Sequence, residues 1–350
     1  MSKASLYAAR SLLCFLKKFA LFACMGIGGL GVGFSPNSIA QTALPMEIIV
    51  PFGAGGGADE LARFSARLLE DQLDTRVTVT NVPGATGNLG MARLLAAPND
   101  GRTLAVLTND TFASLAFYNA PWSPSEVIPL AILTRQSSAL LVAANSSFRS
   151  WQDFAAQARK APRTLRVAIS GYGSPDYIAL EQLSSKGIQL TPLPIDNPQE
   201  RYQALLEGSA DALYEQPGDV RNFIDAGRMR PIMMFSAARS QDFKDVPTSG
   251  ELGMGTGLIQ FRALVVKAGT DPQIVRRLVD SIARIASAPE FKSFLSRQFA
   301  TADSFVAADG ARTFMRRQMD EMKQVVEELP LHARFPLDNK HRDEPVSPSF

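Results

Sequence analysis

The chain has 350 residues, 46% of them hydrophobic, and its 36 basic and 34 acidic residues give a formal charge of only +2. Its two cysteines, Cys14 and Cys24, lie within the first 40 residues, so the rest of the chain excludes disulfides, thiol catalysis and cysteine-ligated metals. Residues 41–350 are enough for two hydrophobic cores of ordinary size.

The N-terminal segment has the pattern of an export signal. Basic residues come first, an apolar run extends from Phe19 to Phe34, and Ser38-Ile39-Ala40 is a typical cleavage sequence. The pattern predicts a cleavable signal peptide over residues 1–40 and a periplasmic protein. A membrane anchor is the alternative, but a spanning helix needs about 20 apolar residues, and this run is shorter and rich in glycine. The four bases removed with the signal are Lys3, Arg10, Lys17 and Lys18.

Loss of those four bases leaves 32 bases against 34 acids, a formal charge of −2. The basic balance therefore belongs to the export signal, and we expect no nucleic-acid partner. A second alternative is lipid anchoring at Cys24, because Leu21-Phe22-Ala23-Cys24 resembles a lipobox. Only five apolar residues separate Lys18 from that cysteine, too few for the apolar part of such a signal.

After residue 40, strand-like runs alternate with amphipathic stretches, which favours βαβ units. The first strand is expected at 46–50 and is followed by a glycine-rich turn and a helix over 59–73. Further along the chain, strands are expected at 77–80, 104–107 and 165–169, and helices at 90–97, 150–159, 178–185, 198–207 and 219–226, with a late helix beginning at Asp271-Pro272.

Two strand–glycine loop–helix units indicate two α/β lobes, each a mostly parallel sheet flanked by helices. The chain is expected to cross between them near Leu140–Ala144 and near Phe261–Val266. Lobe 1 is then 41–142 plus 263–330, and lobe 2 is 143–262. The tail, 331–350, is rich in proline and charge and is expected to pack poorly.

The sharpest local feature is the loop Pro51–Asp59, with glycines at 53, 55, 56 and 57. Glycines between a strand and a helix let backbone amides approach a ligand, and the helix N-terminus favours an anion. Asp59 is expected to cap that helix. A phosphate-binding P-loop is excluded because no Gly-Lys-Ser/Thr follows. The dinucleotide pattern fits Gly53-x-Gly55-x-x-Ala58, yet the second strand ends in Asn81-Val82-Pro83-Gly84, without the acid that holds a ribose.

Two more turns, 81–87 and 170–175, offer amides and small hydroxyls at the ends of predicted strands. Each alone is an ordinary tight turn. Three such loops together indicate a ligand site, because open α/β sheets bind ligands at the carboxyl ends of their strands.

Six segments occur in a fixed order along the chain. They are Pro51-Phe52-x-x-Gly55-Gly56-x-x-Asp59-x-x-x-Arg63, Asn81-x-Pro83-Gly84-Ala85-x-Gly87-x-x-Gly90, Asp100-Gly101-x-Thr103-Leu104, Gly171-x-Gly173-Ser174-Pro175, Asp245-Val246-Pro247-Thr248-x-x-Glu251 and Ala268-Gly269-Thr270-Asp271-Pro272. This ordered set resembles the Bug/TctC family, the extracytoplasmic solute receptors of tripartite tricarboxylate transporters, and the resemblance covers roughly residues 46–328.

The resemblance implies a two-lobed, type II-like periplasmic binding protein fold that closes on a small organic acid and needs no cofactor. It also implies a monomer that delivers its ligand to transporter membrane subunits. The ligand-binding residues expected on this basis are Phe52, Gly53, Ala54, Gly55, Gly56, Gly57, Gly84, Ala85, Ser170, Gly173 and Ser174. Further candidate ligand-binding residues, which the resemblance does not supply, are Asp59, Asn109 and Asp196.

Departures from the family pattern bear on the ligand. Ala58 stands where the family commonly has threonine, Thr86 where it commonly has glycine, and Asp196 where a lysine is frequent. If Asp196 faces the cleft, its carboxylate disfavours a strongly anionic ligand, whereas a solvated Asp196 has no such effect. We therefore hypothesise a monocarboxylate, or an acid that carries an amino or amide group.

An enzyme is the less favoured class. The only histidines, His332 and His341, lie in the tail, no nucleophile elbow or metal-ligand spacing occurs, and nothing fixes the separation of Asp176, Asp196 and Glu215. The segment Tyr214–Asp219 is expected to border the cleft, with Asp219 as a helix cap. A periplasmic sensor that reports ligand occupancy to a signalling protein shares the same chemistry.

Overall fold

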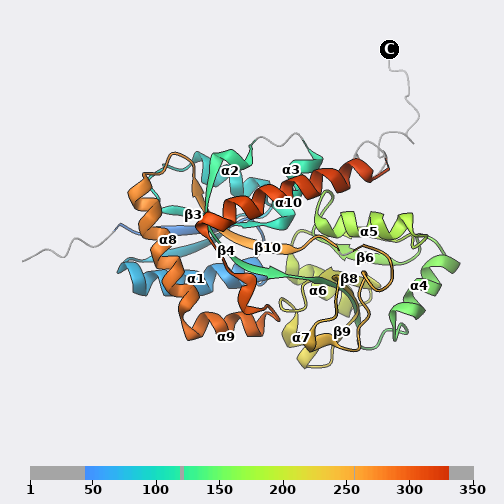
Figure 1. Cartoon of the computed structure of the whole chain (residues 1–350). Helices are drawn as coiled ribbons and strands as arrows, with labels where there is room; N and C mark the ends of the chain where they lie inside the picture. Colours follow the sequence, from blue (N-terminus) through green and yellow to red (C-terminus); the bar gives the residue numbers. More distant parts are fainter. Residues whose placement is uncertain (1–43, 119–121, 256, 331–350) are drawn as a thin grey trace, which may run out of the picture. The chain divides into compact units, whose positions relative to one another are not determined.

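The computed structural model describes residues 44–118, 122–255 and 257–330. The predicted signal peptide and the predicted tail lie outside these described residues. Within the described ranges, no helix combines the length and the apolar character that a membrane span requires. The strands form two sheets, each covered by helices (Figure 1).

The first sheet has the strand order β11-β4-β10-β3-β1-β2. β1 runs parallel to β2 and β3, whereas β10 runs antiparallel to β3 and β4. The bounds are Met46–Val50 for β1, Val77–Asn81 for β2, Thr103–Thr108 for β3, Val127–Gln136 for β4, Gln260–Lys267 for β10 and Val306–Ala307 for β11.

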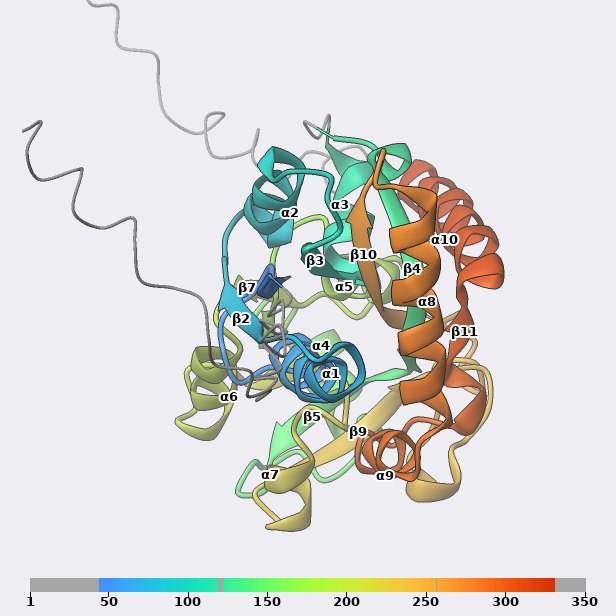
Figure 2. The same ribbon diagram turned by 90° about the vertical axis from the view of Figure 1, so that its left-hand side faces the viewer.

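Successive side chains of β1 point to opposite faces of the first sheet, and each face contributes to its own hydrophobic core. Ile48 and Val50 pack with α1, α8 and α9, while Ile49 faces the opposite way, toward α2, α3 and α10. Figure 2 shows α2 and α3 on one side of this sheet and α1 on the other. The helices are α1 Gly57–Leu73, α2 Asn88–Ala96, α3 Asn109–Phe117, α8 Pro272–Ser287, α9 Pro289–Arg297 and α10 Ala308–Glu328.

The second sheet has the order β7-β6-β8-β5-β9. β6 is parallel to β7 and β8, and β5 is antiparallel to β8 and β9. Helices α4 and α5 cover one face and α6 and α7 the other. The bounds are β5 Ser138–Ala143, β6 Arg166–Ile169, β7 Thr191–Pro194, β8 Ala212–Glu215, β9 Met229–Phe235, α4 Trp151–Lys160, α5 Pro175–Ser185, α6 Pro198–Leu206 and α7 Arg221–Asp225.

The predicted two-lobed α/β fold is confirmed, but both sheets are mixed rather than mostly parallel. The chain passes to the second sheet at Ser137 and returns between Phe235 and Gln260. β5 therefore pairs in the second sheet, although the expected boundary at residue 142 assigns it to lobe 1. The exact domain bounds stay a prediction. Four 3₁₀ turns complete the described structure, at Ala85–Gly87, Pro124–Glu126, Gln241–Phe243 and Ala302–Ser304.

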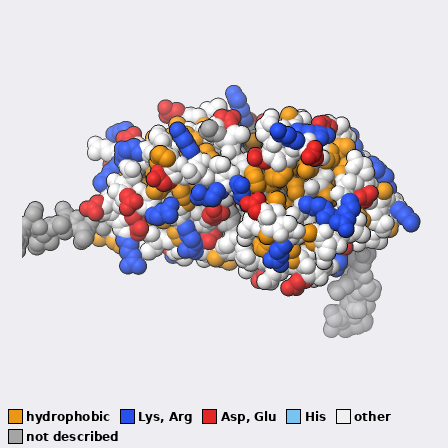
Figure 3. All heavy atoms as spheres, turned by 90° about the horizontal axis from the view of Figure 1, so that it is seen from below, with side chains coloured by type: hydrophobic (Ala, Val, Ile, Leu, Met, Phe, Trp, Pro, Cys, Tyr) orange, Lys and Arg blue, Asp and Glu red, His pale blue; other side chains and the backbone are white. Residues whose placement is uncertain are grey.

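Two predicted helix starts are confirmed in detail. Ser150 and Asp153 form a capping box at the start of α4, and Asp271 caps α8 with Pro272 in its first turn. Both signals depend only on neighbours in sequence, which is why they could be recognised without the fold. On the molecular face shown in Figure 3, basic and acidic side chains are interspersed, and no single sign of charge dominates.

Candidate functional site

A cavity of about 40 Å³ lies between the two lobes, where several strands end and several helices begin. From lobe 1 it receives the first glycine loop, the start of α3 and β10. From lobe 2 it receives the residues after β6 and β8 and the starts of α5 and α6. Its lining residues are Phe52, Gly53, Gly56, Gly57, Ala58, Thr108, Asp110, Ser170, Asp176, Pro198, Arg201, Tyr202, Glu215, Gln216, Asp219 and Arg262.

The start of α1 forms one end of this cavity. Gly56 is the residue before the helix, and no side chain caps the helix there. The first N–H groups of a helix have no intrahelical partner and carry a partial positive charge. Gly57 and Ala58, the first two residues of α1, both line the cavity. This end therefore offers amides and a favourable field to an anion.

Asp59 is not the helix cap that the sequence suggested. It is the third residue of α1, and its carboxylate accepts hydrogen bonds from Gly55 N–H (3.0 Å), Asn81 Nδ2 (3.0 Å) and Arg63 Nη2 (2.9 Å). Although burial opposes the shift, these bonds hold the pKa of Asp59 below its usual value. Asp59 therefore ties the glycine loop to the end of β2 and is not among the cavity-lining residues.

Two arginines are paired with carboxylates in the walls of the cavity. Arg201 Nη2 lies 3.0 Å from Glu215 Oε2, within lobe 2. Arg262, on β10 of lobe 1, forms an ion pair with Asp219 of lobe 2 and donates to Gln216 Oε1 (3.0 Å) and Gln136 Oε1 (3.2 Å). All four ion-paired side chains are less than 10% exposed.

Asp219 was also expected to be a helix cap, and that prediction is wrong. α7 begins at Arg221 after Val220, with no side-chain cap. The carboxylate of Asp219 turns instead to Arg262. Burial raises the pKa of Asp219 to about 7, against the opposing effect of Arg262. For Arg262, burial lowers the pKa, but Asp219 and Glu215 outweigh it and keep the guanidinium charged.

Asp110 and Asp176 form no ion pair among the described residues and meet at one hydroxyl. Asp110 is the second residue of α3 in lobe 1, and Asp176 is the second residue of α5 in lobe 2. Ser170 Oγ lies 3.0 Å from Asp110 Oδ1 and 2.8 Å from Asp176 Oδ2. Burial and the neighbouring Asp110 raise the pKa of Asp176 to about 8, and burial raises that of Asp110 as well.

Three buried polar atoms in this region lack a partner among the described residues. They are the Tyr202 hydroxyl, Asp219 Oδ1 and Arg201 Nε. Tyr202 is only 1% exposed, and burial raises its pKa, so its hydroxyl stays protonated. Because buried polar groups are normally hydrogen-bonded, such orphans in a cavity wall mark a place for a polar molecule.

Glycines allow the lobes to touch. A Cβ on Gly56 would lie 2.7 Å from Pro198 Cγ, and one on Gly57 would overlap the carboxylate of Asp219. Gln199 Nε2 also donates to Gly55 O across the cleft (2.7 Å). The remaining cavity is close to the volume of one water molecule in the liquid, about 30 Å³. An organic acid can enter only when the lobes part.

Among the predicted site residues, five line the cavity: Phe52, Gly53, Gly56, Gly57 and Ser170. The others lie elsewhere, so their ligand contacts stay a prediction. Asp196 is exposed, Ala54 and Ala85 are exposed, and Gly55 lies against the side chain of Gln199. Asn109 is buried and donates to Ile259 O (2.8 Å), and Ser174 caps α5. Gly84 packs against Leu89, and Gly173 packs against Phe117 and Tyr118.

Sequence reasoning missed half of the six charged residues in the wall, namely Asp110, Arg201 and Arg262. A signal was present for Asp110, which follows a predicted strand directly, as the glycine loops do. No local signal marks Arg262, which lies inside a strand and reaches the cavity only through the fold. Among the described residues, no group of three or more side chains is arranged to hold a metal ion.

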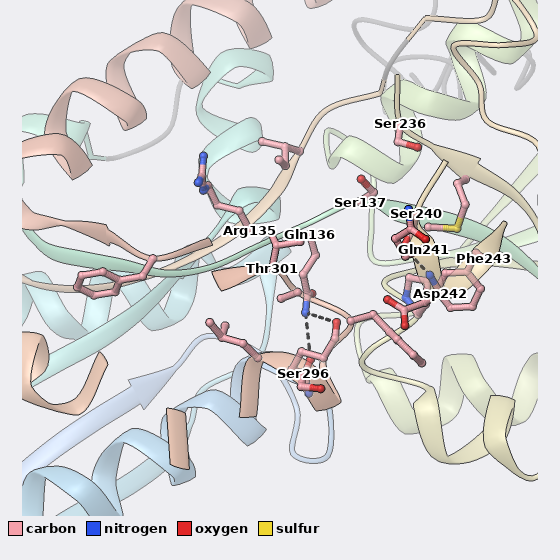
Figure 4. A pocket seen from close by; sticks show the side chains of 18 of the residues that line it. Arg135, Gln136, Ser137, Ser236, Ser240, Gln241, Asp242, Phe243, Ser296 and Thr301 are labelled. Carbon is pink, nitrogen blue, oxygen red and sulfur yellow. Dashed lines mark hydrogen bonds between the residues drawn. The ribbon is translucent and has the colours of Figure 1, made fainter. Parts of the chain in front are cut away.

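A larger pocket of about 750 Å³ lies near the crossing between the lobes, bordered by β4, α9 and the segment after β9 (Figure 4). Gln136 separates it from the smaller cavity, because its Nε2 donates to Gln298 O (3.0 Å) and its Oε1 accepts from Arg262. The first glycine loop and the buried carboxylates do not line this pocket. We therefore place the candidate ligand site in the smaller cavity.

Comparisons with known proteins agree with this architecture. The sequence model of the tripartite tricarboxylate transporter family receptor, TctC, matches residues 61–331. Protein BugT of Bordetella pertussis is 27% identical over 316 residues, which cover 88% of this chain and 97% of BugT. MatC from Rhodopseudomonas palustris with bound malate superposes with a TM-score of 0.75 at 24% identity, covering 81% of this chain and 99% of MatC.

A second R. palustris structure, with adipate, superposes with a TM-score of 0.76 at 22% identity and covers 81% of this chain and 97% of its own. At these identities the two structures establish a shared fold, the two-lobed architecture of periplasmic binding proteins.

Proposed function

We propose, from the premise that this chain belongs to the tripartite tricarboxylate transporter family of receptors, that it is a periplasmic solute receptor without catalytic activity. It captures a small organic carboxylate, or one that also carries an amide, between two closing lobes. The observation that carries this proposal is the uncapped start of α1, where Gly56, Gly57 and Ala58 line a cavity that both lobes enclose.

The amides of α1 suit a carboxylate, but they do not suffice alone. Hydrogen bonds to a charged group contribute about 1.5–3 kcal/mol each, and micromolar affinity needs about 8 kcal/mol in total. Contacts from lobe 2 must add to those of the glycine loop. Ser170 and Arg201 are the polar lobe 2 residues placed to supply them, because both line the same cavity.

Closure by a hinge explains how a ligand of several carbons uses so small a cavity. The lobes are joined by the chain at Ser137 and by the segment between β9 and β10. When they part, the contact of Pro198 with the glycine loop opens and the start of α1 becomes accessible. MatC and the adipate-bound neighbour hold small organic acids, which is the ligand class that this proposal assigns.

Export and delivery complete the proposal. The signal peptide over 1–40 is removed in transit, and the receptor then meets the membrane subunits of a tripartite transporter. N-terminal sequencing of the protein from a periplasmic fraction should begin at Gln41. A mature protein that begins at a lipid-modified Cys24 would contradict soluble export.

A thermal-shift screen of the mature protein tests the receptor function. The panel contains mono-, di- and tricarboxylates, amino acids and acid amides. A ligand that binds the native state raises the unfolding midpoint with its concentration, so at least one carboxylate should do so. Turnover of that compound would overturn the receptor assignment in favour of an enzyme. The absence of a shift with every carboxylate would overturn the carboxylate class.

A further inference from the structure

The acid end of the cavity holds more negative charge than its arginines balance. Two of the four carboxylates, Glu215 and Asp219, are paired with Arg201 and Arg262. Asp110 and Asp176 form no ion pair among the described residues, although the charge of Arg201 acts on both, and Asp176 is only 4% exposed. Burial of unpaired carboxylates is strongly unfavourable. A proton or a bound cation must therefore compensate at least one of them.

The hydrogen bonds at Ser170 indicate where a compensating proton lies in this structure. The hydroxyl lies within bonding distance of both Asp110 and Asp176, and the Ser170 N–H also donates to Asp176 (2.8 Å). One hydroxyl proton can be donated to only one carboxylate. The other contact becomes a full hydrogen bond when that carboxyl is protonated and donates to the serine oxygen. One extra proton thus satisfies both contacts through which Ser170 links Asp110 of lobe 1 to Asp176 of lobe 2.

The field at a helix start stabilises the charge of each acid taken alone, but it does not offset the repulsion between the two acids. A carboxylate in the first turn of a helix is stabilised by the helix field, and both acids occupy that place, Asp110 in α3 and Asp176 in α5. The two helices belong to opposite lobes, so closure moves the two carboxylates toward each other. Like charges at such close range disfavour closure unless something positive lies between them.

Unpartnered groups beside the acids point independently to a polar ligand. Within the described part of the chain, Asp219 Oδ1 has no donor and the Tyr202 hydroxyl has no partner, and both residues line the same cavity with less than a tenth of their side chains exposed. A nitrogen with several N–H donors suits the two acids, and Asp219 Oδ1, which lies against Gly57, offers it a further acceptor. A second carboxylate in this place would be repelled by Asp110 and Asp176, and the unpartnered Arg201 Nε is the donor that it would find there.

We propose that the ligand is an organic acid that carries a protonated nitrogen, and that this nitrogen takes the place of the proton between Asp110 and Asp176. The assignment rests on the proposed receptor function, with the ligand carboxylate at the start of α1. The nitrogen binds one carboxylate from each lobe and so favours the closed form. The displaced proton goes to solvent. Dicarboxylates such as malate and adipate are poor ligands for this chain.

Isothermal titration calorimetry of the mature protein tests the proposal with matched probes. Amino acids of three to six carbons, with the amine at either end, are titrated beside the monocarboxylate and the dicarboxylate of the same length. We expect an amino acid to bind at least tenfold more tightly than both of its matched acids. At pH 7, titration in buffers of different ionisation enthalpy should show proton release on binding.

Failure of this inference differs from failure of the receptor function. If acids without nitrogen bind as tightly as the amino acids, the nitrogen site is wrong and the carboxylate receptor stands. If alkylamines without a carboxylate bind more tightly than amino acids, the carboxylate assignment fails. If no probe binds, both are overturned.

Substitutions locate the nitrogen. Asp110→Asn and Asp176→Asn should each lower the ratio of amino acid affinity to monocarboxylate affinity about 10- to 100-fold, the worth of a hydrogen bond to a charged group. Glu200→Gln, at an exposed acid on α6, is the matched control. Equal losses for amino acids and plain acids would overturn the assignment. Should a variant fail to fold, the probe comparison and the proton release of the unmodified protein still decide.

Discussion

The two ends of the cleft are built in different ways. The end at α1 consists of main-chain groups from one continuous segment, Phe52–Ala58, whose own side chains carry no charge, although the Asp219 carboxylate lies against Gly57. The opposite end consists of charged side chains from α3, α5, α6, β8 and β10, with Arg262 and Asp219 joining the lobes. A main-chain end accepts an anion of almost any shape, because every residue has an amide. A side-chain end selects by charge, and it depends on closure.

Loss of Arg262 should have the largest effect, because it leaves Asp219 buried and unpaired. For Arg262→Met we expect the free energy of unfolding to fall by about 3–5 kcal/mol, as for other broken buried ion pairs. Urea denaturation at pH 7.5 measures it. The double variant Arg262→Met/Asp219→Asn should recover most of the loss. A single variant as stable as the parent would show that the charged end does not hold the lobes together.

Gly57→Ala separates the two ends by preventing closure. The added Cβ would overlap the Asp219 carboxylate, and overpacking of this kind costs about 1–3 kcal/mol. Ligand affinity should fall about 5- to 150-fold. The lobe itself should not be destabilised, because alanine favours the helix more than glycine. Calorimetry on this variant, with the exposed Ala54→Ser as control, checks the result. Unchanged affinity would mean that the bound form is more open than this structure.

The main-chain end could be predicted from sequence, whereas the charged end could be predicted only in part, through the segment Tyr214–Asp219 that was expected to border the cleft. The glycine loop is one continuous segment between a strand and a helix, and its sequence pattern alone indicates an anion site. Asp219 also has a local pattern, an acid shortly before a helix, and that pattern predicted a cap. The ion pair with Arg262, 43 residues along the chain, prevails over it. A single sequence contains no signal for such a pairing across lobes.

The fold likewise has features that a local sequence pattern predicts and features that depend on residues far apart in the chain. β1 was predicted with its observed bounds and α1 to within two residues at its start, because periodicity is a local property. The mixed character of the sheets was missed, since strand direction is set when β5 and β10 cross between lobes and pair antiparallel. Hydrophobic runs predict where a strand lies but not which neighbour it joins.

The pH dependence of the empty protein tests the shared proton. The groups that face Asp176 are Asp110 from α3, Arg201 from α6 and Glu215 from β8, and its pKa is raised from 3.8 to about 8. Between these values the native state holds a proton that the unfolded chain releases. The free energy of unfolding therefore decreases as pH rises from about 4 to about 8 and levels off above.

Thermal unfolding of the ligand-free protein across that range measures the effect. The parent should lose a few degrees more than Asp176→Asn. Parallel curves for the two proteins would mean that Asp176 does not share a proton in the folded state, and the charged end would then be balanced in another way.

Asp196→Asn should have the smallest effect on ligand affinity, and it tests whether the charged end extends as far as Asp196. Asp196 follows β7, is exposed, and lies outside the set of residues that line the cavity. Arg201 Nη1 contacts its main-chain oxygen (3.3 Å), which asparagine retains. Because exposed charges are screened by salt, affinity for the best amino acid should stay within about twofold of the parent. A tenfold loss would extend the charged end to Asp196 and support the hypothesis that this acid, seen from sequence alone, selects the ligand.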